Sequence, residues 1–79
     1  MRVVIKKQAE KYLLKVPEHI RLRLQEGIEN IKNGEGDIVR LKENKYRYKI
    51  NHYRILFTLY KESQTIEITE INTRTNIKY

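Results

Sequence analysis

The segment from residue 41 to 57, LKENKYRYKINHYRILF, alternates apolar and basic residues on either side of Asn51-His52. A period of two predicts strands that bury one face. Asparagine tolerates the left-handed backbone of a two-residue turn, so Asn51-His52 predicts the tip of a β-hairpin. The predicted pairs on the apolar face are Ile50 with Tyr53, Tyr48 with Ile55, and Tyr46 with Phe57.

The opposite face of this hairpin is basic. It carries Arg47 and places Lys49 directly across from Arg54, although like charges on facing strands repel each other. From Arg40 to Arg54 the chain has six basic side chains and one acidic side chain, a net +5 of its formal +7. A bound phosphate would resolve this repulsion, so we interpret the face as a binding surface for a polyanion, most simply nucleic acid. The alternative is a solvated strand face whose cations splay apart.

The chain has 79 residues and no cysteine. We therefore expect one domain, residues 1–79, near the lower size limit of a single hydrophobic core. The absence of cysteine fits a cytoplasmic location. No apolar run approaches the ~18 residues that span a bilayer, and we find no signal peptide, so we expect no contact with a membrane. With two histidines far apart in the sequence, we also expect no metal site and no cofactor.

Periodicity predicts the elements before the hairpin. Residues 3–5 are β-branched and predict a first strand. A helical spacing begins at Lys7 and ends at Pro17, which also suits the first turn of a second helix. That second helix ends at Asn33-Gly34, and Gly27 on its apolar stripe is expected to let the first helix approach closely. The stripe consists of Ile20, Leu24, Ile28 and Ile31.

Two further strands, residues 38–42 and 65–71, flank the hairpin in the sequence. In an unbroken last strand Glu70 faces the core and Ile71 lies opposite Arg54, so we expect the strand to end or bulge there. The predicted class is α+β in the order β-α-α-β-β-β. Two N-terminal helices pack on one face of an antiparallel sheet and leave the basic face open.

Four segments occur in series along the chain: VPEHIRLRL at 16–24, GDIVRLK at 36–42, YRYKINHYRILF at 46–57 and INTRTNIKY at 71–79. In this order they resemble the RelE/ParE superfamily of toxins from bacterial type II toxin–antitoxin systems. The resemblance implies a RelE-like fold and cytoplasmic action beside a cognate acidic antitoxin. In the RelE branch, which we favour, it implies a ribosome-dependent mRNA endoribonuclease that inhibits translation.

RNA is cleaved without metal when its 2′-OH attacks the adjacent phosphorus, which requires a base, cations for the developing charge and an acid. Crowding by cations favours the neutral form of a lysine, so Lys49 is the candidate base. Arg54 and Arg74, which the last strand brings near the turn, would hold the phosphate. The resemblance implies that Tyr79 stacks on a base or orients the nucleophile. The other candidates for RNA binding are Lys42, Lys45, Arg47, His52 and Lys78.

Two other functions stay open at this point. The ParE branch shares the fold but poisons DNA gyrase and has no RNase activity. The same basic face would also suit a non-catalytic module that binds RNA or a partner. The hairpin cations and Arg74 favour the nuclease, whose expected partners are an acidic, partly disordered antitoxin, mRNA and the ribosome.

Overall fold

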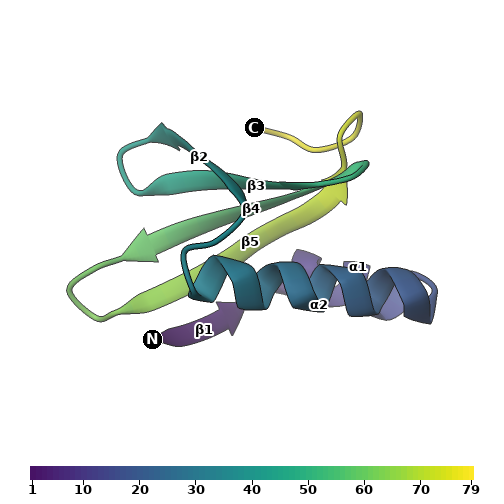
Figure 1. Ribbon diagram of the computed structural model, residues 1–79, viewed down its shortest axis with the longest axis horizontal. Helices are drawn as coiled ribbons and strands as arrows, with labels where there is room; N and C mark the ends of the chain where they lie inside the picture. Colours follow the sequence, from purple (N-terminus) through teal and green to yellow (C-terminus); the bar gives the residue numbers. More distant parts are fainter.

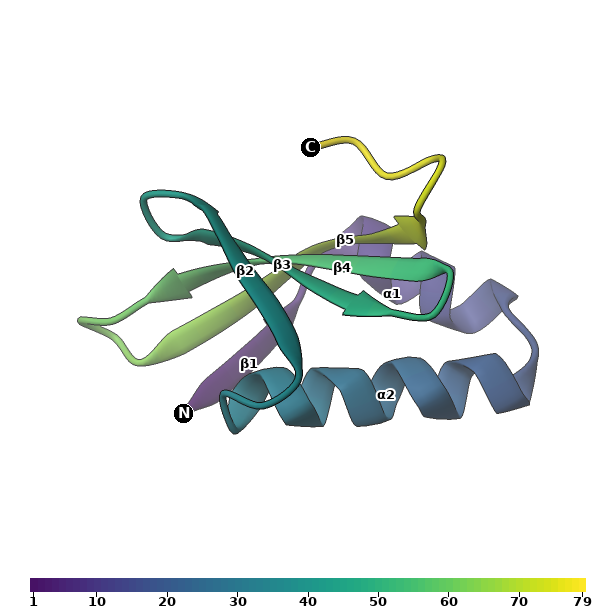
Figure 2. The same cartoon turned by 45° about the horizontal axis from the view of Figure 1, so that its top comes forward.

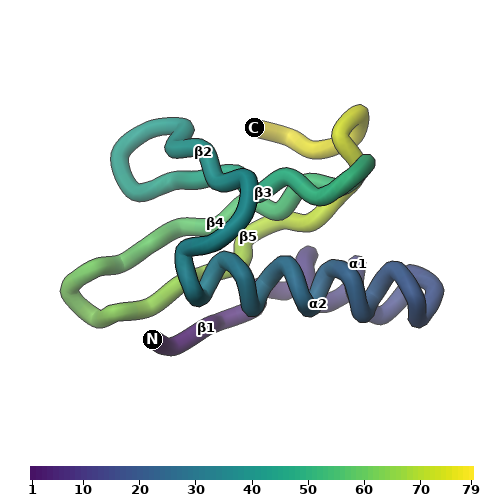
Figure 3. The backbone as a smooth tube through the Cα atoms, in the orientation of Figure 1, coloured from purple at the N-terminus to yellow at the C-terminus, as the bar shows by residue number.

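The computed structural model describes residues 1–79, and the chain path can be followed in Figures 1 and 3. It contains two helices and five strands. No helix has both the length and the apolar character needed to cross a membrane. The elements are β1 Arg2–Ile5, α1 Lys7–Lys15, α2 Glu18–Lys32, β2 Asp37–Lys42, β3 Lys45–Ile50, β4 Tyr53–Tyr60 and β5 Thr65–Thr73.

The five strands form one sheet in the order β1-β5-β4-β3-β2. β1 pairs with β5 in parallel, and all other neighbouring strands are antiparallel. The predicted α+β class is therefore confirmed. The predicted order β-α-α-β-β-β has one strand too few, although the five segments predicted as strands from periodicity are all present. The sheet is also mixed and not purely antiparallel, because the short strand β1 inserts beside the last strand of the chain.

The two helices are joined by a sharp change of direction at Val16-Pro17. The residue before a proline avoids helical backbone, and Val16 is extended, with ψ 156°. The Arg21 side chain of α2 then binds carbonyls at the end of α1. Its Nε donates to Leu13 O at 2.7 Å and its Nη2 to Val16 O at 3.0 Å. These carbonyls lack helical partners, so Arg21 ties the two helices together.

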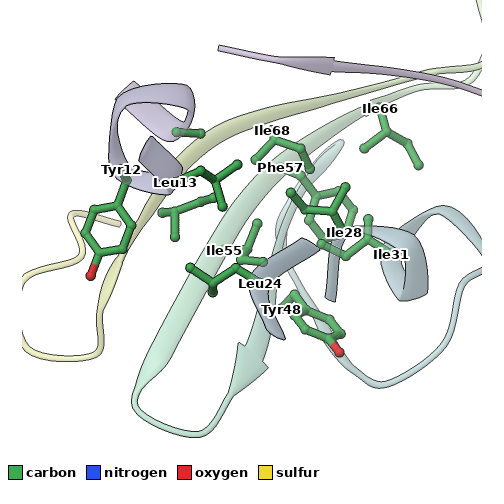
Figure 4. Close-up of a cluster of buried hydrophobic side chains, with 12 residues drawn as sticks. Tyr12, Leu13, Leu24, Ile28, Ile31, Tyr48, Ile55, Phe57, Ile66 and Ile68 are labelled. Atoms are coloured by element: carbon green, nitrogen blue, oxygen red, sulfur yellow. The ribbon is translucent and has the colours of Figure 1, made fainter. Parts of the chain in front are cut away.

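Both helices lie on one face of the sheet (Figure 2) and bury a single core against it (Figure 4). A Cβ atom at Gly27 would stand 2.9 Å from Cε2 of Tyr48. Asn30 Nδ2 donates to the hydroxyl of the same tyrosine at 3.1 Å. The prediction that Gly27 admits α1 is therefore wrong, because Tyr48 of β3 occupies the space. The largest fully buried side chains of the core are Leu24, Ile55, Ile68 and Ile71.

The hairpin of β3 and β4 has the predicted register, with all three apolar pairs as expected. Asn51 supplies the left-handed residue of the turn, with φ +53°. Tyr48 and Ile55 face the core. Because alternate residues point to opposite faces, Lys49 and Arg54, which pair with each other, lie on the face away from the helices. We call this surface the open face.

Strand β5 contains a bulge, as expected. Phe57 of β4 pairs with Ile68, but its neighbour Leu56 pairs with Glu70, which leaves Thr69 as an extra residue. The Thr69 Oγ1 donates to the Leu56 carbonyl at 3.1 Å. This hydrogen bond satisfies a main-chain acceptor at the point where the ladder is interrupted.

The bulge changes which face the last residues of β5 occupy. Ile71 pairs with Ile55 in the core, and Asn72 lies opposite Arg54. Glu70 consequently lies on the open face. The bulge thus removes both conflicts of an unbroken strand, in which Glu70 would face the core and Ile71 would lie opposite Arg54.

The packing of α2 can be tested with two leucines of the same helix. Leu24 is 0% exposed and Leu22 is 57% exposed. Leu24→Ala should lower the free energy of unfolding by about 3 kcal/mol, because it leaves a cavity in the core. Leu22→Ala should change it by less than about 0.5 kcal/mol. Urea denaturation followed by circular dichroism measures both values, and equal losses would contradict this packing.

Candidate nucleic-acid interface

Three basic residues lie beside the hairpin turn. Lys49 and Arg54 pair across the hairpin. The backbone N–H of Arg74 donates to His52 O at 2.7 Å, which brings the third cation to the same place. The predicted approach of Arg74 to the turn is confirmed. We call the group of Lys49, His52, Arg54 and Arg74 the turn cluster.

The position of Arg74 depends on how the end of β5 is held. The last residue of this strand, Thr73, pairs with Tyr53. One side chain, Gln8, binds both main-chain groups of Ile71, donating from Nε2 to the carbonyl and accepting from the N–H, each at 2.9 Å. Beyond the end of β1, this side chain makes the hydrogen bonds to β5 that the backbone of a longer β1 would make. The segment that leads to Arg74 is therefore fixed on both edges.

The guanidinium of Arg54 folds back over the turn. Its Nη1 donates to Asn51 O at 3.0 Å and to Tyr53 O at 2.9 Å. These carbonyl oxygens are partly negative, so they offset the repulsion from Lys49 that the sequence predicts. The Nε and Nη2 atoms donate to no protein atom. Two donors in a fork are therefore free for the oxygens of an anion.

Arg47 lies on the open face between the two ends of β3, but its side chain is only 18% exposed. Its Nη2 stands 3.9 Å from Oδ1 of Asp37, and its Nη1 is buried without a hydrogen-bond partner. A buried donor without an acceptor costs free energy. The arrangement places Arg47 beneath the surface, where an anion that reached Nη1 would remove that cost.

A second group of predicted residues lies at the other end of the open face, in a groove of about 530 Å³. The C-terminal segment, residues 74–79, passes over the side of the sheet that the helices leave uncovered (Figure 2). It buries Ile77 and brings the last residue to the end of the sheet where β2 and β3 meet. Four predicted residues line this Tyr79 groove: Lys42, Lys45, Lys78 and Tyr79.

The structure thus divides the predicted site into two parts. Lys45 in the Tyr79 groove and Lys49 in the turn cluster lie on the same strand, about 13 Å apart at ~3.3 Å per residue. Tyr79 belongs to the groove, so it is not adjacent to Lys49 and Arg54. The sequence could not indicate this, because the path of the C-terminal segment depends on where Ile77 packs.

Glu70 is the residue of this surface that the sequence interpretation missed. It is the single acidic residue that lines the Tyr79 groove, and it reaches the open face through the bulge. The signal was present in the spacing of the apolar residues. Ile66 and Ile68 are two positions apart, whereas Ile68 and Ile71 are three apart, which is the pattern of a strand with one extra residue.

No group of three or more histidine, cysteine, aspartate or glutamate side chains is close enough to hold a metal ion. Burial, and then the neighbouring Tyr53, raises the pKa of Tyr12 above its ordinary value of 10.0. Tyr12 belongs to the helix-covered core, so its neutral hydroxyl adds no charge to the open face.

The mixed five-stranded sheet with two helices on one face is a fold that this chain shares with solved structures of RelE toxins. The structure is similar to a RelE–RelB complex from Pyrococcus horikoshii OT3, with a TM-score of 0.80, 24% identity and coverage of 96% of this chain and 97% of that chain. For a RelB–RelE antitoxin–toxin complex from Methanococcus jannaschii the values are 0.72, 29%, 91% and 91%. For the isolated E. coli RelE toxin they are 0.76, 16%, 91% and 82%.

Neither a protein-family model nor a curated protein matches the sequence. The resemblance to RelE toxins that the four sequence segments predict is nevertheless confirmed by these structures. The chain has the RelE-like fold over more than nine-tenths of its length.

The hydrogen bonds of Arg54 give a stability prediction. Arg54→Ala should lower the free energy of unfolding by about 1 kcal/mol, because two partly exposed hydrogen bonds to the turn carbonyls are lost. Lys49→Ala is a matched control, because it removes the facing cation but no hydrogen bond. It should leave the free energy of unfolding unchanged. Thermal unfolding compares the two variants. An Arg54→Ala protein as stable as the unsubstituted one would show that repulsion, and not turn binding, dominates at this pair.

Proposed function

We propose that this domain is the toxin of a toxin–antitoxin system and that it inhibits translation by cleaving mRNA on the ribosome, in the cytoplasm. The turn cluster carries the proposal, because it gathers Lys49, Arg54 and Arg74 at one point of a sheet face that no helix covers. The RelE-like fold supports the toxin class. The sequence resemblance to the RelE branch supports the ribosome as the place of action.

In the proposed reaction Lys49 Nζ accepts the proton of a 2′-OH group, and the 2′-oxygen attacks the adjacent phosphorus. The bond from phosphorus to the 5′-oxygen breaks, and that oxygen takes up a proton from a water molecule. The products are a 2′,3′-cyclic phosphate and a 5′-hydroxyl end. The free Nε and Nη2 of Arg54, with the guanidinium of Arg74, bind the non-bridging oxygens on which charge develops. This path requires no metal ion.

The remaining cations extend the proposed RNA path along the open face. Lys42, Lys45 and Lys78 lie toward the Tyr79 groove and would neutralise phosphates on one side of the cleaved bond. His52 and Arg47 would contact phosphate oxygens near the turn. Tyr79 is 68% exposed, and its ring is proposed to stack on a base, as aromatic side chains do with single-stranded RNA.

Controlled expression with mapping of mRNA 5′ ends tests the proposal. The unsubstituted protein should arrest growth and produce new 5′ ends within translated frames. Arg54→Ala should reduce cleavage about a hundredfold, the scale of one lost donor to transition-state charge. Arg54→Lys should restore little, because lysine cannot form the fork. Arg23→Ala, which removes an exposed cation from α2, is the matched control and should retain full cleavage.

The same experiment separates the competing functions. Growth arrest with intact mRNA and damaged DNA would point to a gyrase poison. Intact mRNA and intact DNA would point to a module that binds without catalysis. A folded Arg54→Ala protein that cleaves at the full rate would show that the turn cluster is not the active site.

We further propose that a cognate acidic antitoxin, partly disordered when free, folds across the open face. Similar solved structures are complexes of RelE with RelB. The affinity should fall at least about tenfold between ~0.05 and ~0.5 M salt, because the attraction is between opposite charges. Lys49→Glu should weaken binding more than Lys11→Glu on α1. Titration calorimetry measures this, and an affinity insensitive to salt would count against an electrostatic interface.

A further inference from the structure

The Tyr79 groove contains one acidic residue among several basic ones. Lys42, Lys45 and Lys78 line it with Glu70. Glu70 pairs with Leu56 across the strands and is half-buried. No lysine or arginine nitrogen lies within ion-pair distance of its carboxylate, since the two ion pairs of the structure involve other acids. The carboxylate is therefore available to a ligand.

A carboxylate in this position cannot serve the phosphates of an RNA strand, because like charges repel. Its two oxygens accept hydrogen bonds and therefore require donors on the ligand. In single-stranded RNA the bases supply such donors on their Watson–Crick edges. The surrounding lysines can hold the backbone while the carboxylate meets a base.

Three further features of the groove suit a base. Tyr79 contributes an aromatic ring that is 68% exposed and can stack on a flat heterocycle. Leu56 and Thr58 line the groove and supply apolar atoms beneath it. The volume of about 530 Å³ lies within the range of small-molecule sites.

We propose that the Tyr79 groove is a base-recognition subsite in which Glu70 selects guanine. Guanine presents two adjacent donors, N1–H and the N2 amino group, to the two carboxylate oxygens. Adenine and cytosine each offer one amino group there, and uracil places its single N–H between two acceptor oxygens that the carboxylate repels. The proposal rests on the proposed nuclease function. Glu70 pairs with Leu56, which lies two residues from Arg54, about 7 Å along β4 at ~3.3 Å per residue. The subsite therefore reads a nucleotide near the cleaved bond and not the cleaved bond itself.

Mapping of mRNA 5′ ends in cells that express each variant tests the subsite. The unsubstituted protein should enrich guanine at one fixed position near the cleavage sites. Glu70→Gln keeps the size of the side chain but replaces one acceptor by a donor, so the enrichment should fall about tenfold while cleavage continues. Glu62→Gln, in the turn between β4 and β5, removes the same charge away from the groove and should keep the enrichment. Thermal unfolding confirms that both variants are folded.

The outcomes separate the subsite from the nuclease. Cleavage with the same base profile before and after Glu70→Gln overturns the subsite and leaves the nuclease in place. Absence of cleavage by the unsubstituted protein overturns the nuclease. In that case fluorescence anisotropy decides the subsite, using 2′-O-methyl oligouridine with and without one guanosine. A preference for the guanosine that disappears in Glu70→Gln supports it, and equal affinities overturn it.

Discussion

The hydrogen bond from the Thr69 hydroxyl to the Leu56 carbonyl accompanies the one irregularity in β5, and much of the open face depends on that irregularity. Without the extra residue, Ile71 would lie on the open face, and the residues around it in β5 would also exchange between the core and the open face. With it, Ile71 fills the centre of the core, and Asn72 lies opposite Arg54. Packing on one face and the placement of polar groups on the other are thus two results of the same local geometry.

Backbone contacts, more than ion pairs, hold the cations of the open face. The ion pair of Arg47 spans 3.9 Å, whereas Arg54 binds two turn carbonyls and the N–H of Arg74 binds His52 O. Carbonyl partners fix a guanidinium without neutralising its charge. A surface built in this way is ordered before an anion arrives, which lowers the reorganisation that binding or catalysis would require.

The sequence predicted the parts of the fold that depend on local periodicity. The hairpin register followed from alternation around Asn51-His52, and the limits of α2 followed from Pro17 and Gly34. Non-local features were missed. A strand as short as β1 contains too few residues for its sequence to indicate which strand it pairs with. Its parallel pairing with β5 therefore could not be predicted. The approach of Arg74 to Lys49 and Arg54 was predicted, whereas the position of Tyr79 could not be predicted, because the course of the C-terminal segment depends on tertiary packing.

The parallel pairing of β1 with β5 joins the first element of the chain to the last, for example Val3 to Ile66. Contacts between residues so distant in sequence form only after a long loop has closed, and they slow folding. A nascent chain that has reached only the end of β4 still lacks Ile66, Ile68 and Ile71 from its core. The domain can therefore acquire its native structure, and with it an aligned basic face, only after synthesis has passed residues 65–73.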